Sequence, residues 1–318
     1  MRCRVFLGVV ANLSWLLSCT PTPQAGVPTL IDASSPDSGS VDANTARDAQ
    51  TDAGSCMLPS ARSALHFYTS SDGRTFSGDA LIYSRVSVPH ILHDKSSDQY
   101  LVSFQIFEDP PLCDTMGFIK LSTSGTVLGP VSHLSVKSEL VNGFDPTLLM
   151  VRDKLALVYT VRPPNKKQPC ITVAIGSDIS TLVQQKDLLW CSETDSEAYM
   201  DPAAIFIDPY LYVYTPSDAS MSTGTPVSYY AKIDVSQWTI GASGKISNLS
   251  MFLLGSMVAT GDSACAYRFY GTMQNQVRTA CTQDGVTFTM GSDVLAGVDP
   301  GVARNSTGGY AMVIAAEP

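Results

Sequence analysis

The sequence predicts an all-β fold, a five-bladed β-propeller, and three observations lead to it. Short runs rich in Val, Ile, Leu, Tyr, Phe and Thr alternate with Gly, Pro, Asp and Ser from residue 61 to residue 318. A unit of apolar strand, polar turn and second apolar strand recurs about every 56 residues. A turn motif, S/T-x-D-G-x-T-F, occurs at residues 70–76 and again at residues 282–288.

The repeat gives the number of blades. Four units begin with a residue followed by proline, and these pairs are Val88-Pro89, Asp145-Pro146, Asp201-Pro202 and Asp299-Pro300. A weaker copy at residues 257–270 supplies a fifth unit. The chain ends after two strands of its last unit, so we expect the strand at residues 65–69 and its Asp-Gly turn to complete that blade. Such closure leaves no open sheet edge. A large β-sandwich is the alternative fold.

Two segments precede the predicted propeller. Residues 1–18 combine Arg2 and Arg4 with an apolar run of about 13 residues, which is too short to cross a bilayer core as a helix. This segment resembles a signal peptide, and its end, Leu-Leu-Ser before Cys19, resembles the lipobox of bacterial lipoproteins. The resemblance implies export, acylation of Cys19 and a lipid anchor in the cell envelope, with Thr20 favouring the outer membrane. An ordinary cleaved signal is the alternative.

Residues 19–60 are predicted to be a disordered tether. They are rich in Ala, Asp, Ser and Pro and contain few large apolar residues, so they cannot offset the entropy of folding. The formal net charge is −9, and part of it lies in this tether. That balance argues against nucleic acid as a partner. We expect a monomer that contacts the membrane through its anchor.

The cysteines indicate disulfides rather than a metal centre. Six cysteines remain besides Cys3 and Cys19, which allows 15 pairings. Short sequence separations favour Cys170–Cys191 and Cys265–Cys281, which leaves Cys56–Cys113. The sequence has no C-x-x-C motif and its four histidines are scattered, so we expect neither a metal site nor a cofactor.

The proline-containing pairs also supply the candidate site. The innermost strand of each propeller blade lines a central funnel, so Asp145, Asp201 and Asp299 are expected to converge at its mouth, with His90 just after the first proline. Carboxylates that share a funnel raise one another's pKa and can hold a sugar or a cation. These four residues are therefore the candidate ligand-binding set. The alternative is that each aspartate caps its own strand.

One stretch resembles a known family. Residues 199–208, Tyr-Met-Asp-Pro-Ala-Ala-Ile-Phe-Ile-Asp, and the Tyr-Leu-Tyr that starts at residue 210 resemble a hallmark of glycoside hydrolase family 43. Those enzymes are five-bladed propellers that cleave polysaccharides such as arabinan and xylan. The resemblance implies that Asp201 tunes the pKa of a catalytic acid, and it makes Asp201 and Asp145 the candidate catalytic residues.

The family's other catalytic residues have no clear counterparts. The general base of the family is an aspartate in the first blade, and Val88 stands at the corresponding position. The general acid is a glutamate that opens the fourth blade, where residues 257–262 offer only Asp262. An inverting glycosidase needs both groups. The sequence therefore favours a propeller that binds a carbohydrate or a protein without catalysis. A glycosidase with a non-standard acid and base, and a structural envelope protein, are the alternatives.

Overall fold

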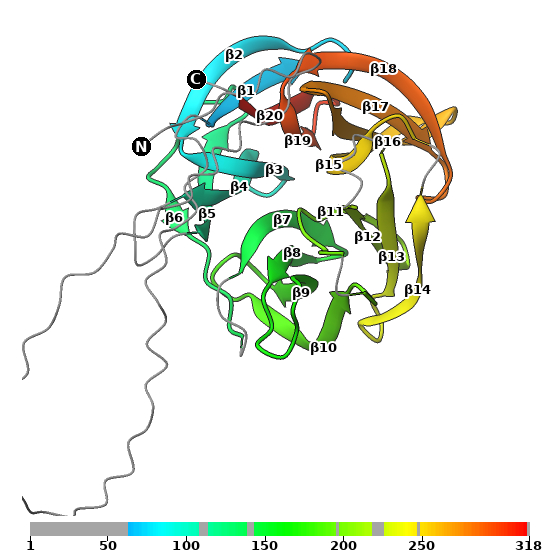
Figure 1. Ribbon diagram of the computed structural model, residues 1–318. Helices are drawn as coiled ribbons and strands as arrows, with labels where there is room; N and C mark the ends of the chain where they lie inside the picture. The colour runs from blue at the N-terminus through cyan, green and yellow to red at the C-terminus, as the bar shows by residue number, and fades with distance from the viewer. Residues whose placement is uncertain are drawn as a thin grey trace, which may run out of the picture. The chain divides into compact units, whose positions relative to one another are not determined.

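The described residues form a ring of five antiparallel sheets around a central axis (Figure 1). A computed structural model describes residues 63–107, 114–138, 143–194, 197–217, 226–246 and 249–316. Each sheet has four strands, which confirms the predicted five-bladed β-propeller. The signal peptide, the tether and Cys19 lie outside the described residues. In the part of the chain that is described, no helix is long and apolar enough to cross a membrane.

The blades follow one another along the chain, and each of blades 1 to 4 runs from its innermost to its outermost strand. Blade 1 contains β3 (Val86–Asp94), β4 (Gln99–Phe107), β5 (Asp114–Ser122) and β6 (Ser132–His133). Blade 2 contains β7 (Phe144–Val151), β8 (Lys154–Val161), β9 (Cys170–Gly176) and β10 (Val183–Cys191). Blade 3 contains β11 (Ala203–Ile207), β12 (Tyr210–Pro216), β13 (Ser228–Asp234) and β14 (Thr239–Ile246). Blade 4 contains β15 (Phe252–Asp262), β16 (Cys265–Met273), β17 (Gln276–Thr282) and β18 (Phe288–Ala296).

Blade 5 is built from both ends of the folded part. Its inner strands are β19 (Val298–Arg304) and β20 (Tyr310–Ala316), and its outer strands are β1 (Ala64–Ser70) and β2 (Ser77–Ser84). Strands β1 and β20 pair antiparallel over seven consecutive positions, from Ala64 opposite Ala316 to Ser70 opposite Tyr310. The predicted closure by the N-terminal strand is therefore confirmed, and the pairing gives the last blade four strands as in the others.

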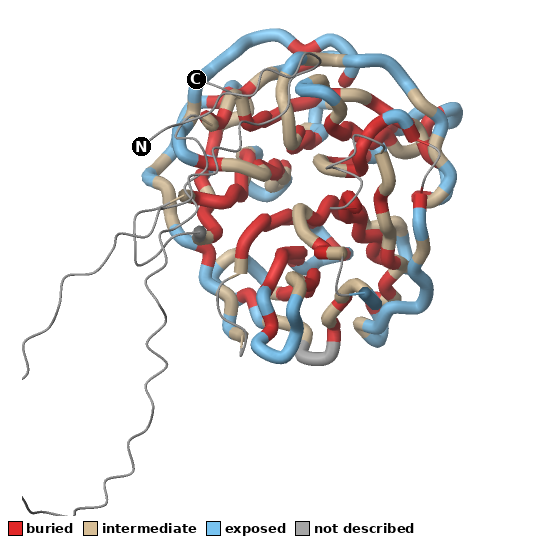
Figure 2. The backbone as a smooth tube through the Cα atoms, in the orientation of Figure 1, coloured by how far each residue is buried: buried red, intermediate tan, exposed pale blue. Residues whose placement is uncertain are grey.

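The hydrophobic core consists of five clusters, one between each pair of neighbouring blades. Buried residues run along the inner strands, and exposed ones gather on outer strands such as β2 and β14 (Figure 2). Alternate residues of a strand belong to different clusters because side chains alternate between the two faces of a sheet. On β12, Leu211 and Val213 pack towards blade 2, whereas Tyr212 and Tyr214 pack towards blade 4. Second strands are therefore apolar on both faces, which explains their unbroken apolar runs in the sequence.

The two Asp-Gly turns join outer strands and also bind the preceding blade. They connect β1 to β2 and β17 to β18, which are equivalent strands of blades 5 and 4. Both glycines have positive φ, +66° at Gly73 and +77° at Gly285. The Gly73 carbonyl accepts a hydrogen bond from the Tyr270 hydroxyl, and the Gly285 carbonyl accepts one from the Tyr214 hydroxyl, each at 2.7 Å. These turns therefore fasten blade 5 to blade 4 and blade 4 to blade 3.

Two of the expected disulfides are present. Cys170 pairs with Cys191 across β9 and β10, and Cys265 pairs with Cys281 across β16 and β17. Each bond links neighbouring strands of one blade, with sequence separations of 21 and 16 residues. The third expected pair, Cys56–Cys113, lies outside the described residues.

Candidate functional site

The proline-containing pairs form a repeated bend at the start of the inner strands. The residue before proline has a positive φ in four blades: 46° at Val88, 52° at Asp145, 49° at Asp201 and 52° at Asp299. Aspartate tolerates this left-handed region better than other residues do, because its short polar side chain can bond locally. A β-branched valine does not have that advantage, so Val88 keeps the bend of its blade at a conformational cost.

The aspartates hold the ring together across blade boundaries. The Asp145 carboxylate accepts a hydrogen bond from the backbone N–H of Asp201 at 3.3 Å. The carboxylate of Asp299 accepts one from the backbone N–H of Val88. In each case the side chain of one blade binds the bend of the next blade. These bonds give Asp145 and Asp299 a structural role of a kind that the sequence did not predict.

Three carboxyl groups interact at this end of the inner strands. Burial raises the pKa of Asp145 to about 6, against hydrogen bonds from the backbone N–H and the side chain of Asp201, and the charge of Asp299 raises it further. Burial also raises the pKa of Asp299 to about 7, with a further contribution from the charge of Asp201.

The three aspartates differ in exposure. Asp145 is 2 % exposed, whereas Asp201 and Asp299 are partly exposed. Asp145 is therefore the least exposed residue of the three. Among the described residues, no cluster of three His, Cys, Asp or Glu side chains is arranged to hold a metal ion.

The structure separates His90 from the aspartates. His90 is 7 % exposed, and burial lowers the pKa of its imidazole to about 4. Its side chain lines a cavity of about 1040 Å³ near the other end of the inner strands, and none of the three aspartates lines this cavity. Nearness to Pro89 in sequence placed His90 with the aspartates, and a shared role of these residues in binding a ligand stays a prediction.

The fourth blade departs from the expected register. Its inner strand carries its irregularity between Phe252 and Ser256, with Gly255 at φ +146°, so residues 257–262 are not the counterpart of the other bends. Asp262 lies at the far end of β15, where its carboxylate accepts a hydrogen bond from the backbone N–H of Ala264. It caps a hairpin and does not belong to the ring of aspartates.

A second polar group lies beside Asp201 in the chain. The Ser217 hydroxyl lies 3.1 Å from each carboxylate oxygen of Glu197. Tyr199 packs between Trp190 and the partly exposed Tyr229, with ring centroids 4.7 and 5.3 Å away. Burial raises the pKa of Tyr199 to about 12, and the charges of Tyr229 and Glu197 add to this. Ser217 lies 20 residues after Glu197 in the chain, and Tyr229 lies further on, so no local sequence motif marks this group.

Comparisons with known proteins identify the fold. No family model matches the chain, and the comparison with curated proteins gives no match. Solved structures of similar fold include a family GH43_1 enzyme from Xanthomonas citri complexed with xylose. It has TM-score 0.53 and 10 % identity, and the match covers 73 % of this chain and 87 % of that one.

Two further solved structures give the same result. A thermostable family-43 glycoside hydrolase has TM-score 0.51 and 10 % identity, with 73 % of this chain and 89 % of that one covered. An α-L-arabinofuranosidase from Clostridium thermocellum has TM-score 0.50 and 11 % identity, with 71 % and 80 % covered. At such identities the likeness establishes a shared five-bladed architecture and leaves the chemistry to be argued from the residues.

Proposed function

We propose that this propeller binds a carbohydrate at the end of the inner strands where Asp145, Asp201 and Asp299 lie, and that it does not hydrolyse the carbohydrate. Asp201 and Asp299 are the partly exposed residues of the three, and Asp145 is buried. The observation that carries the proposal is the hydrogen bond from the backbone N–H of Asp201 to the Asp145 carboxylate at 3.3 Å, which holds two carboxyl-bearing residues of neighbouring blades together. A carboxyl with a raised pKa, such as Asp145, can donate a hydrogen bond when it is protonated, and an ionised carboxylate accepts one, so the group can bind sugar hydroxyls in both ways.

The close approach of these two residues argues against hydrolysis by this pair, because a carboxylate oxygen of Asp145 lies 3.3 Å from the backbone nitrogen of Asp201. The two carboxyls of a glycosidase are separated by ~5 Å in retaining enzymes and by ~6.5–9.5 Å in inverting ones. The bends of blades 1 and 4 carry Val88 and Gly255, neither of which can donate or accept a proton through its side chain.

The surroundings support a sugar as the ligand. Tyr229 offers a partly exposed ring beside Glu197, and Tyr199, two residues before Asp201 in the chain, packs against this ring. Aromatic faces next to carboxylates suit the apolar faces and the hydroxyls of a sugar ring. One solved structure of the same architecture is complexed with xylose.

A glycan array and a reducing-sugar assay on the full chain test the proposal. Asp201→Asn and Asp299→Asn should each weaken glycan binding at least tenfold, because both side chains face the ligand. Asp153→Asn, in the exposed hairpin between β7 and β8, is the matched control and should bind as the parent does. Release of reducing sugar that is lost in Asp201→Asn would replace the proposal with a hydrolase. Absence of any bound glycan would favour a protein partner or a structural role.

We also propose that the propeller is held at the cell envelope by a lipid on Cys19. The support is the basic and apolar N-terminus that ends at this cysteine, followed by the tether at residues 19–60. Such an anchor would leave the mouth of the channel free to meet large ligands outside the cytoplasm.

A further inference from the structure

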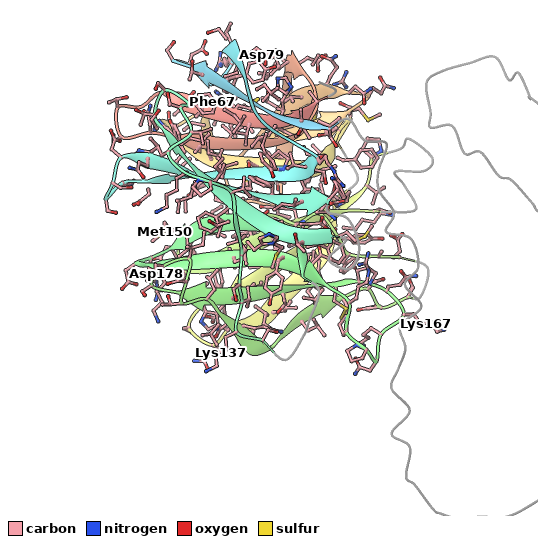
Figure 3. All side chains as sticks on the ribbon, turned by 90° about the vertical axis from the view of Figure 1, so that its left-hand side faces the viewer. Phe67, Asp79, Lys137, Met150, Lys167 and Asp178 are labelled. Carbon is pink, nitrogen blue, oxygen red and sulfur yellow. A yellow bond between two sulfur atoms is a disulfide. The ribbon has the colours of Figure 1, made fainter. Side chains whose placement is uncertain are left out.

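A cavity lies near the hairpin ends of the inner strands. It occupies about 1040 Å³ and is lined by residues of the inner strands β3, β7, β15 and β19, of the hairpins that follow three of them, of β4, β5 and β8, and of the turn that follows β9. Seen from the side, the lining residues Met150 and Asp178 lie at one end of the ring, and Lys167, in the loop that follows β8, lies at the other (Figure 3). The cavity is large enough for an organic ligand, since typical ligand pockets measure ~300–1000 Å³.

The walls of this cavity are aliphatic. The apolar side chains that line it include Leu92, Leu148, Met150, Leu155, Val258 and Val302. Met150 is 43 % exposed, which is unusual for a large apolar side chain. No Phe, Tyr or Trp is among the lining residues. Sugars bind against aromatic rings, so these walls favour an aliphatic ligand instead.

The rim of the cavity is cationic. Four basic side chains line it, namely Lys95, Lys120, Arg152 and Arg304, against two acidic ones, Asp94 and Asp178. Both acids already accept hydrogen bonds within their own turns, from Ser96 and Ser97 and from Ser177 and Ser180 respectively. These bonds lower the pKa of each carboxyl, so both are ionised at neutral pH. Arg152 is paired with the Asp208 carboxylate at 3.3 Å, so Lys95, Lys120 and Arg304 carry the positive charge at the opening, in a chain whose formal net charge is −9.

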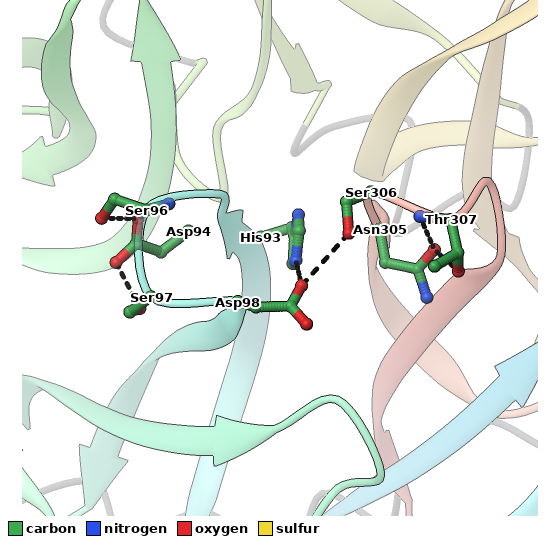
Figure 4. Close-up of polar contacts among 8 residues, drawn as sticks. All are labelled: His93, Asp94, Ser96, Ser97, Asp98, Asn305, Ser306 and Thr307. Atoms are coloured by element: carbon green, nitrogen blue, oxygen red, sulfur yellow. Dashed lines mark hydrogen bonds and ion pairs between the residues drawn. The ribbon is translucent and has the colours of Figure 1, made fainter.

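Two buried histidines lie in the wall. His90 and His93 are 7 % and 5 % exposed, and the Nδ1 atom of each has no hydrogen-bond partner among the described residues. The orientation of His93 is fixed, since its Nε2 lies 2.9 Å from the Asp98 carboxylate, which also accepts a hydrogen bond from Ser306 (Figure 4). Both histidines line the cavity, so a ligand that fills it changes the surroundings of their imidazole rings.

We infer that this cavity binds an amphipathic carboxylate, with the aliphatic body against the leucine and valine walls and the carboxylate at the basic rim. The positive charge at the rim favours an anionic group on the ligand, and the aliphatic walls favour an aliphatic chain. None of the three aspartates lines this cavity, so the inference does not rest on the proposed carbohydrate site.

Calorimetric titration of the full chain with decanoate, below its micelle concentration, tests the inference. We expect saturable binding, and we expect butanoate and 1-decanol to bind at least tenfold more weakly than decanoate. Lys95→Gln and Met150→Gln change exposed positions of the rim and wall and should each weaken decanoate binding severalfold. Asp201→Asn should leave it unchanged, which separates this site from the proposed carbohydrate site.

A second measurement addresses the histidines without replacing buried residues. The chain has four histidines, so their imidazole signals can be assigned by nuclear magnetic resonance. Decanoate should shift the signals of His90 and His93 and leave those of His66 and His133 in place. Equal binding of 1-decanol and decanoate would overturn the role of the rim. Absent or non-saturable binding would overturn the site as a whole.

Discussion

Replacing Asp145 by asparagine should stabilise the protein at pH 8 and leave its stability unchanged at pH 4. Asp145 is buried, and its carboxyl accepts the backbone N–H of Asp201. An amide oxygen can accept the same hydrogen bond, and the amide N–H₂ can donate to the Asp201 carboxylate. Asp145→Asn therefore keeps the local geometry and removes only the charge that the buried site disfavours.

The pKa gives the size and the sign of the effect. Burial raises the pKa of Asp145 from 3.8 to about 6. The folded state therefore binds more protons than the unfolded state between these values. The stability that protonation contributes is complete below pH ~4 and is lost as the pH rises through ~6. A shift of ~2 pKa units corresponds to ~3 kcal/mol, which is the expected gain of Asp145→Asn at pH 8.

Thermal unfolding of the parent and of Asp145→Asn at pH 4 and pH 8 measures this gain. With ~2–4 °C per kcal/mol for a chain of this size, the variant should melt ~6–12 °C higher than the parent at pH 8. The difference between the two proteins cancels the opposing contribution of His90, whose pKa is lowered by burial. Asp153→Asn serves as the exposed control and should give no difference at either pH. A variant that melts lower than the parent at pH 8 would refute the reasoning, because the native site would then prefer the charged carboxylate.

Two further predictions concern the link between blades and the anchor. Tyr214→Phe removes the hydroxyl that donates to the Gly285 carbonyl at 2.7 Å, so urea unfolding should show a loss of ~1–3 kcal/mol, whereas Tyr267→Phe, at a partly exposed position, should show none. An unchanged midpoint in Tyr214→Phe would mean that the turn does not fasten the blades. Cys19→Ser should abolish incorporation of labelled palmitate in a bacterial host and leave residues 1–18 uncleaved; label retained in the variant would contradict the anchor.

The fold could be predicted because its determinants are local and repeated. Asp-Gly turns and apolar strand pairs depend on a few adjacent residues, so each blade can be recognised separately. Blade 4 was predicted in the wrong register. Its bend spans one residue more than the others and lacks an Asp-Pro pair, because Gly255 supplies the unusual φ there.

The candidate site was less accessible to sequence reasoning. The pairs that precede the inner strands predicted which aspartates lie at the ends of the strands, but not that Asp145 binds the N–H of Asp201 in the next blade. The cavity near the hairpin ends is lined by one to three residues from each of several hairpins, including Lys95 and Arg304. Such a set of residues has no continuous sequence pattern. Contacts of this kind depend on the angle between neighbouring blades, and that angle is determined by closure of the whole ring.

The pairing of β1 with β20 in blade 5 also determines when the propeller can finish folding. His66 pairs with Ile314, so the first strand of the folded part finds its partner almost at the other end of the chain. Hairpins within blades 1 to 4 close over short loops. The pairing of β1 with β20 closes a loop of nearly the whole domain, so its entropic cost of loop closure is larger. Such long-range pairing slows folding. During synthesis or export, β1 and β2 cannot pair with β20 until that strand emerges. Blade 5 therefore forms last, and the propeller folds cooperatively as a whole only when its last strand is present.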